Sequence, residues 1–115
     1  MSEPKRGEIW VVDLNPTRGQ EIQKARPAIV ISRDLFEQIP LRIIVSITSW
    51  QPKFEYRPFM VRISASAETG LLNESASNTL QVRSISIERF SRCLGRVPPA
   101  VLAEILAEIS ICIDE

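Results

Sequence analysis

The hydrophobic residues of this chain follow a strand period over most of the sequence and a helical period only at its end. Within residues 58–64, Phe59, Val61 and Ile63 occupy every second position, the pattern of a strand with one buried face. After Pro98 and Pro99, apolar side chains instead recur at helical spacing, at Val101, Leu102, Ile105, Leu106, Ile109, Cys112 and Ile113. The sequence therefore predicts a mainly β protein that ends in an amphipathic helix.

Other segments have strand composition and are separated by turn residues. They span residues 8–14, 28–32, 42–48 and 79–87. Residues 28–32 form a continuous apolar run, which is typical of a strand buried on both faces. Five or six short strands with one C-terminal helix predict an α+β fold: a small, strongly curved antiparallel sheet or SH3-like barrel with the helix packed on it.

The length of 115 residues predicts a single domain over residues 1–115, because two cores would leave each half near about 60 residues, where burial becomes marginal. We expect no membrane association, because the chain lacks an uncharged apolar run of about 18 residues. The first twenty residues carry six charged side chains and no apolar signal region. A cytoplasmic location is therefore expected.

The formal net charge is zero, but the charges are unevenly distributed. Residues 1–62 hold ten basic and seven acidic side chains, whereas residues 63–115 hold four and seven. Long-range attraction of a nucleic acid should therefore be weak, although a phosphate-binding surface on the basic half is compatible with the sequence.

The chain contains two cysteines and no histidine, which removes the usual zinc-binding patterns. We therefore expect no metal site and no cofactor. Cys112 lies on the apolar side of the predicted helix, so we expect it to be a small buried hydrophobic residue. The sequence leaves the role of Cys93 open.

A loop of about a dozen residues precedes the buried strand at residues 28–32, and it is too long for a simple hairpin. It begins with turn-forming residues at 15–19 and contains Glu21 and Arg26, a carboxylate and a guanidinium just before a stiff segment. A guanidinium offers bidentate hydrogen bonds to phosphate. Arg26 has two interpretations from sequence alone, a phosphate ligand or a loop arginine paired with Glu21.

The order of these motifs resembles the MazF/PemK family of toxin endoribonucleases over nearly the whole chain. The resemblance is carried by residues 6–16, by Gly19, Glu21, Arg26 and Pro27, and by the pair Thr48-Ser49. It implies metal-independent, sequence-specific cleavage of single-stranded RNA by the ribose 2′-hydroxyl, as part of a toxin–antitoxin system that inhibits translation. It also implies a homodimer and an acidic antitoxin as partners.

The resemblance assigns Arg26 to charge stabilisation and Thr48 to binding the scissile phosphate, and it makes Glu21 a candidate base. From the residues alone, Thr48 is more typical of a turn or cross-strand partner than of a catalytic group. Glu21 fits at least as well a solvated carboxylate that holds Arg26, and Asp13 is a weaker candidate base. RNA contacts are expected from Asn15, Thr17, Arg18, Gly19, Ser49, Trp50, Lys53, Phe54, Ser75, Gln81 and Arg83. The alternative for Trp50 and Phe54 is simple packing, and for the loop cations solvation.

The chain departs from the family pattern at Ser46, where members commonly carry a proline. The loop at residues 49–57 does not reveal the RNA sequence that is cut. Two rival functions remain: a non-enzymatic toxin of the same fold that binds DNA gyrase, and a degenerate RNA-binding or antitoxin-binding module. Retention of Arg26 and Thr48 argues against the gyrase-binding alternative.

Overall fold

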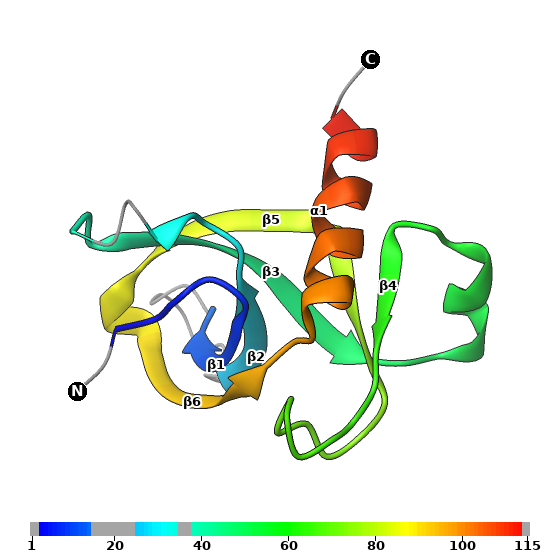
Figure 1. Ribbon diagram of the computed structural model, residues 1–115, viewed down its shortest axis with the longest axis horizontal. Helices are drawn as coiled ribbons and strands as arrows, with labels where there is room; N and C mark the ends of the chain where they lie inside the picture. The colour runs from blue at the N-terminus through cyan, green and yellow to red at the C-terminus, as the bar shows by residue number, and fades with distance from the viewer. Residues whose placement is uncertain (1–2, 15–24, 35–37, 114–115) are drawn as a thin grey trace, which may run out of the picture.

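The computed structural model describes residues 3–14, 25–34 and 38–113, in which six strands form one antiparallel sheet and an α-helix follows the last strand (Figure 1). The elements in chain order are β1 Glu8–Asp13, β2 Ala25–Val30, β3 Leu41–Ser49, the 3-10 helix η2 Pro52–Tyr56, β4 Met60–Ile63, β5 Ser75–Ser86, the 3-10 helix η3 Ile87–Arg89, β6 Phe90–Arg96 and α1 Pro99–Ile113.

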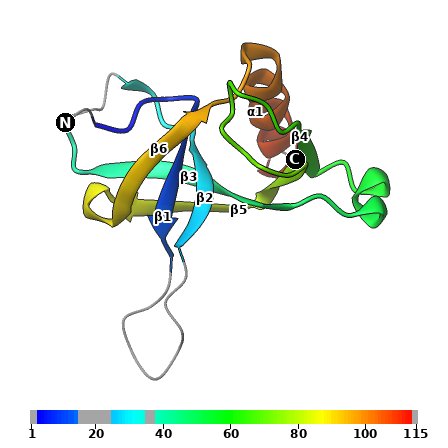
Figure 2. The same cartoon turned by 90° about the horizontal axis from the view of Figure 1, so that it is seen from below.

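The strands are ordered β4-β5-β3-β2-β1-β6 across the sheet. The sheet is strongly twisted, so that β1 and β2 run steeply across β3 and β5 in Figure 2. The predicted mainly β fold with a curved antiparallel sheet and a C-terminal helix is confirmed. Within the described residues the sheet does not close, because β4 and β6 are its two edges and do not pair with each other.

Strand β6 was not predicted from the sequence. Its residues are Phe-Ser-Arg-Cys-Leu-Gly-Arg, and only Phe90, Leu94 and Gly95 are even partly buried, so the strand lacks a strong apolar alternation. It nevertheless pairs with β1, with register shifts at two points. The strand predicted at residues 79–87 begins earlier in the structure, at Ser75. The sequence did not indicate this start, because the first residues have small buried side chains that form no apolar pattern.

One face of the sheet, which we call the helix-covered face, packs against α1. The centre of this contact is Ile105, whose side chain is fully buried among Ile9, Ile29 and Ile63. Leu102, Leu106 and Ile109 of the helix surround it. No helix in the described part of the chain is long and apolar enough to cross a membrane.

The opposite face, which we call the open face, has a smaller core. It consists of Trp10, Val12, Ala28, Val30, Ile44 and Ile85. Because side chains alternate between faces along a strand, β2 and β3 contribute to both cores, as predicted for the continuous apolar run. The open face is not covered by α1 (Figures 1 and 2).

The expectation that Cys112 is buried was wrong. Both Cys112 and Cys93 are exposed free thiols. The last turn of α1 extends past the sheet edge (Figure 1), so the apolar stripe of the helix runs further than the surface it packs on. Ile111 and Ile113 are accordingly 69% and 74% exposed, while the Cys112 Sγ lies 3.8 Å from the Thr79 Oγ1.

Candidate functional site

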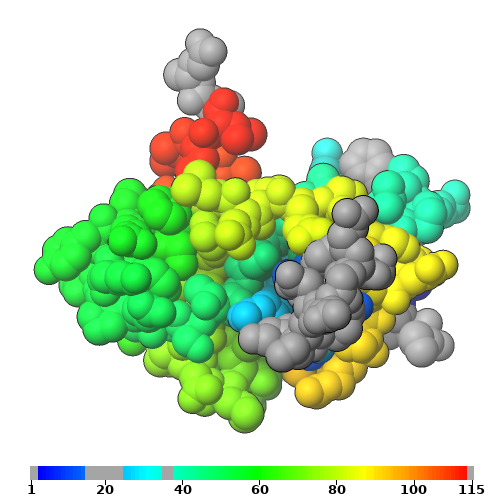
Figure 3. All heavy atoms as spheres, turned by 180° about the vertical axis from the view of Figure 1, so that it is seen from behind, coloured from blue at the N-terminus to red at the C-terminus, as the bar shows by residue number. Residues whose placement is uncertain are grey.

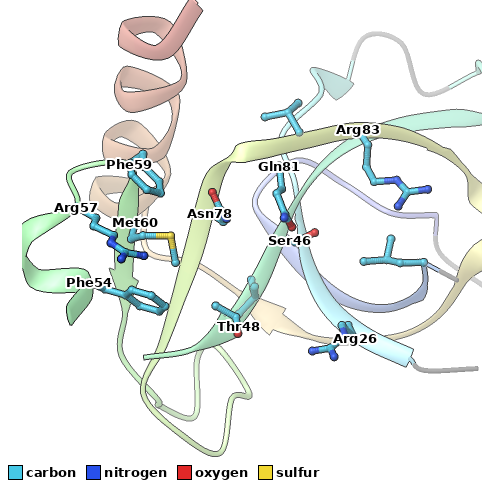
Figure 4. Close-up of a pocket in the computed structure, with 13 residues that line it drawn as sticks. Arg26, Ser46, Thr48, Phe54, Arg57, Phe59, Met60, Asn78, Gln81 and Arg83 are labelled. Atoms are coloured by element: carbon cyan, nitrogen blue, oxygen red, sulfur yellow. The ribbon is translucent and has the colours of Figure 1, made fainter. Parts of the chain in front are cut away.

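Arg26 and Thr48 lie on the two central strands of the sheet. In the β2–β3 ladder Ala28 faces Ser46, so continuing the same register by two residues sets Arg26 level with Thr48. The two side chains therefore leave the sheet on the same side, with Arg26 exposed and Thr48 half-buried. Figure 4 shows both at one end of the strand pair. The loop assignment of Arg26 needs correction, because the residue belongs to β2 and pairs with Val12 of β1.

Two cavities meet at this residue pair. The larger, of about 630 Å³, is on the open face; Figure 3 shows this side of the molecule, with β2 in cyan at the floor of a hollow beside the green η2 and β4 segment. The smaller, of about 390 Å³, lies between β6 and the loop before β5. Arg26 and Thr48 line both cavities.

The charged lining of the two cavities is entirely basic. Arg57 and Arg83 join Arg26 in the larger cavity and Arg92 joins it in the smaller, and no carboxylate of the described residues lines either one. The guanidinium groups of these four arginines make no hydrogen bond or ion pair with the part of the chain that the structure describes, and all four residues are exposed. A local positive potential therefore exists on a chain of zero net charge.

Other arginines of the chain are neutralised by partners. Arg42 pairs with Glu3, Arg62 with Glu74 and Arg96 with Glu8, at 3.3, 3.1 and 3.7 Å between nitrogen and oxygen. Arg42 is buried and also donates hydrogen bonds to the carbonyl oxygens of Pro4 and Ile39, so it fastens the N-terminal segment to β3. The arginines with ion-pair partners therefore have a structural role, whereas the four arginines without such partners are candidates for binding a ligand.

An irregular stretch of β5 shapes the larger cavity. Val45 pairs with Val82 and Ile47 with Ser77, so β5 advances five residues while β3 advances two. The extra residues form a bulge that the Asn78 Oδ1 supports by accepting a hydrogen bond from the Leu80 backbone N–H at 3.0 Å. Gln81 and Arg83 line the cavity beyond the bulge (Figure 4); their expected role in contacting RNA stays a prediction.

Trp50 and Phe54 take the packing role that the sequence analysis left as the alternative. Their rings form an edge-to-face contact with centroids 5.7 Å apart, and Phe54 is buried in a small core with Met60 and Ala76. The guanidinium of Arg62 lies 4.8 Å from the centroid of the Trp50 ring and covers one face of the indole. Phe54 still lines the larger cavity, whereas the exposed Lys53 lines neither cavity.

Glu74 contacts both Trp50 and Arg62. Its carboxylate accepts hydrogen bonds from the Ala65 backbone N–H at 2.9 Å and from the Arg62 Nε at 3.1 Å, while its carbonyl oxygen accepts one from the Trp50 N–H. The Ala65 hydrogen bond, followed by the Arg62 interaction, holds the pKa of Glu74 below its ordinary value. Glu74 therefore holds together Arg62 of β4, the segment after β4 and the backbone at Trp50.

The remaining predicted residues divide in three ways. Ser49 is exposed and lines the smaller cavity, and Ser75 lines it too but is buried, with its hydroxyl donating to the Asn73 carbonyl oxygen at 2.8 Å. Asn15, Thr17, Arg18, Gly19 and Glu21 lie outside the described residues. In the described part of the chain there is no group of three or more metal-binding side chains.

Sequence reasoning missed Asn78, Arg92 and the contribution of Arg57 to the larger cavity. Arg57 was noticed only as one of several loop cations. Arg92 could not be placed because β6 was not predicted. Asn78 carried no signal, since its position depends on the bulge in β5.

Known proteins with similar sequences and structures match nearly the whole chain. A curated relative, endoribonuclease MazF9 of Mycobacterium tuberculosis, is 39% identical over 96% of each chain, and endoribonuclease PemK of Escherichia coli is 31% identical over 95% of this chain and 81% of its own. A crystal structure of MazE–MazF from Deinococcus radiodurans shares the fold, with a TM-score of 0.81 at 23% identity, covering 98% of this chain and 97% of that one.

The family model described as the PemK-like, MazF-like toxin of type II toxin–antitoxin systems matches residues 5–113. This match covers β1 to α1 and both cavities. The chain therefore belongs to the PemK-like, MazF-like family of type II toxins.

Proposed function

We propose that this chain is a metal-independent endoribonuclease toxin that cleaves single-stranded RNA next to Arg26 and Thr48. The ribose 2′-oxygen attacks the adjacent phosphorus, the bond from phosphorus to the 5′-oxygen breaks, and the products are a 2′,3′-cyclic phosphate and a 5′-hydroxyl. The 2′-hydroxyl loses its proton to a base and the leaving 5′-oxygen gains one. The family membership and the curated relatives named endoribonuclease support this activity.

The single observation that carries the proposal is the unpaired arginine set. Arg26 and three further exposed arginines line the two cavities, and no described carboxylate competes with a phosphate for them. A guanidinium binds phosphate oxygens in a bidentate manner and remains charged at every physiological pH. An RNA backbone is the polyanion that such a surface fits, because its charges repeat along a strand.

In this mechanism Arg26 stabilises the charge that develops on the phosphorane oxygens. The Thr48 hydroxyl, which has no hydrogen-bond partner among the described residues, donates to a phosphate oxygen and orients it. Glu21, which lies outside the described residues, is the proposed base, as the family resemblance implies. Histidine, the usual residue for proton transfer near neutral pH, is absent from the chain.

We further propose an acidic antitoxin as the inhibitor of this site in the cytoplasm. Solved structures of this fold include an endoribonuclease in complex with its cognate antitoxin from mycobacterial species, at a TM-score of 0.75 and 20% identity. The carboxylates of an acidic segment would use the same unpaired guanidinium groups as RNA phosphates. Binding of the antitoxin and RNA would then be mutually exclusive.

The proposed oligomer is a homodimer. Exposed apolar side chains occur together on β3, β5 and the end of α1, and they are Leu41, Ile43, Leu80, Val82, Ile111 and Ile113. The contact between Cys112 and Thr79 brings the helix end beside Leu80. A surface of this kind on a monomer favours self-association.

The test is cleavage of a long unstructured RNA in EDTA by wild type and an Arg26→Ala variant, with fragment ends mapped. We expect discrete cuts by wild type and a rate about 100- to 1,000-fold lower in the variant, the cost of removing one charge-stabilising donor. Arg96→Ala, which removes an arginine that pairs with Glu8 outside both cavities, is the matched control. Equal cutting by Arg26→Ala would remove Arg26 from the proposed site, whereas no cutting by folded wild type would favour the gyrase-binding or binding-only alternatives.

A further inference from the structure

We propose that the two cavities bind the nucleotides on opposite sides of the scissile phosphate, and that Arg92 holds an RNA phosphate in the smaller cavity. This inference rests on the proposed function and assigns a second part of the same site. Arg26 and Thr48 line both cavities, so a phosphate held by this pair has one cavity on each side. No other residue of the larger cavity except Ile47 belongs to the smaller one.

The sheet register explains why the cavities diverge from this point. Arg26 and Thr48 leave the sheet toward the open face, whereas their neighbours Pro27 and Ile47 point the other way. Pro27 lines only the smaller cavity, and Ser46, two residues from Thr48, lines only the larger. An RNA strand that passes Arg26 therefore continues around the end of the β2–β3 pair.

Each cavity brings an additional exposed arginine that lines that cavity alone. Arg83 lines only the larger cavity and Arg92 only the smaller, and neither guanidinium has a hydrogen-bond or ion-pair partner among the described residues. Arg92 enters from β6, where it pairs with Val11 of β1. The pairing fixes its backbone next to β1 and leaves the guanidinium exposed to meet a phosphate.

The rest of the smaller cavity suits a nucleoside. Leu71, Leu72 and Leu94 give it an apolar wall, and Leu72 is 93% exposed, as expected for a side chain that is covered only when a ligand binds. Ser49 and Asn73 add hydrogen-bonding groups at its rim. About 390 Å³ is within the ordinary range of small-ligand pockets, roughly 300–1,000 Å³.

The backbone of this cavity is held by a close approach of two segments. Gly70 has a φ of +73°, and a Cβ at this position would collide with the carbonyl oxygen of Leu94 in β6. The loop that carries Leu72 and Asn73 is therefore packed against the strand that carries Arg92. This contact sets the distance between the apolar wall and the guanidinium before any RNA binds.

The experiment uses three RNA oligonucleotides that span a mapped cut: one extended on both sides, one shortened on the 5′ side and one shortened on the 3′ side. The quantity measured is kcat/KM for wild type, Arg83→Gln and Arg92→Gln. We expect each variant to lose about tenfold on the fully extended RNA, the cost of one charge-assisted contact. The slope of log kcat/KM against log salt should become shallower by about 0.7 in each.

The shortened RNAs separate the two cavities. The loss caused by Arg92→Gln should disappear with one truncation and persist with the other, and the loss caused by Arg83→Gln should show the opposite pattern. Arg96→Gln is the matched control on β6, because Arg96 pairs with Glu8 and lines neither cavity. This variant should behave as wild type on all three RNAs.

Two results would overturn the inference while leaving the proposed function intact. In the first, wild type cleaves, Arg26→Ala does not, and Arg92→Gln cleaves the extended RNA as fast as wild type. In the second, the same truncation removes the losses of both Arg83→Gln and Arg92→Gln, which would place both arginines on one side of the cut. Failure of wild type to cleave any RNA would instead reject the proposed function together with the inference.

Discussion

The two faces of the sheet share the same central strands, but their polar side chains differ in whether they have hydrogen-bond partners within the protein. On the helix-covered face, Ile105 and its neighbours seal a continuous apolar core, and the hydroxyl of Thr69 near this core has several hydrogen-bond partners. On the open face and at the strand ends, the Thr48 hydroxyl and four guanidinium groups have no hydrogen-bond partner among the described residues. Polar groups that have hydrogen-bond partners within the protein stabilise the fold, whereas exposed polar groups without such partners are available to a ligand.

This contrast implies that stability and activity depend on separate residues even though β2 and β3 serve both. Burial of Ile29 and Val45 contributes to the free energy of folding, while Arg26 and Thr48 at the ends of the same strands contribute little to it. Variants on each side should therefore change one property without the other.

The largest expected effect on stability is at the centre of the helix-covered face. Ile105→Ala removes a fully buried side chain and should lower the free energy of unfolding by about 2–5 kcal/mol, measured by urea denaturation. RNA cleavage by the folded fraction should remain at the wild-type rate. Tyr56→Ala, at a position 84% exposed and outside both cavities and the proposed dimer surface, is the control and should change stability by less than about 0.5 kcal/mol. Equal stabilities of the two variants would contradict the assignment of the core.

The second prediction compares two threonine hydroxyls. Thr48→Val should reduce the RNA cleavage rate on the order of 100-fold, with the free energy of unfolding changed by less than about 0.5 kcal/mol, because its hydroxyl has no described partner. Thr69→Val should leave the RNA cleavage rate unchanged and lower the free energy of unfolding by roughly 1–3 kcal/mol. The reason is that the buried Thr69 hydroxyl donates to the Ser64 carbonyl oxygen and accepts from the Leu71 N–H. A full cleavage rate in Thr48→Val would remove this residue from the site.

The smallest effect is expected from Glu74, whose carboxylate binds Arg62 and the Ala65 backbone N–H. Its pKa is lowered in the folded protein, so its contribution to stability is present above the unfolded-state value near 4.5 and is lost as the pH falls through the lower folded-state pKa. Melting temperatures of wild type and Glu74→Gln should therefore differ at pH 6 and converge at acidic pH. A difference that stays constant with pH would show that the carboxylate charge is not involved.

Much of the fold was predictable because apolar alternation reports burial directly. The strand at residues 58–64 and the terminal helix followed from periodicity, and β2 followed from its continuous apolar run. Strand β6 was not predictable, since its place in the sheet depends on pairing with β1 rather than on its own side chains. The exposure of Cys112 depends on where the sheet ends beneath the helix, which local spacing does not encode.

The candidate site was predictable only in part, for a similar reason. The resemblance directed attention to Arg26 and Thr48, and the register sets these two residues level with each other, while their roles stay predictions. Trp50 and Phe54 looked like base-stacking residues, yet their burial depends on Arg62, Met60 and other residues distant in sequence. Arg92 enters the site from an unpredicted strand, so no local motif could reveal it.

The alternation along β2 has a consequence for insertions and deletions. Side chains along a strand alternate between the two faces of the sheet. If one residue between Arg26 and Val30 were deleted, the β2 side chains on one side of the deletion would therefore move to the opposite face. The guanidinium would then point toward the helix-covered core, or buried isoleucine and valine would point outward. A single codon deletion here should therefore abolish folding and toxicity together, which makes β2 a segment where in-frame length changes are not tolerated.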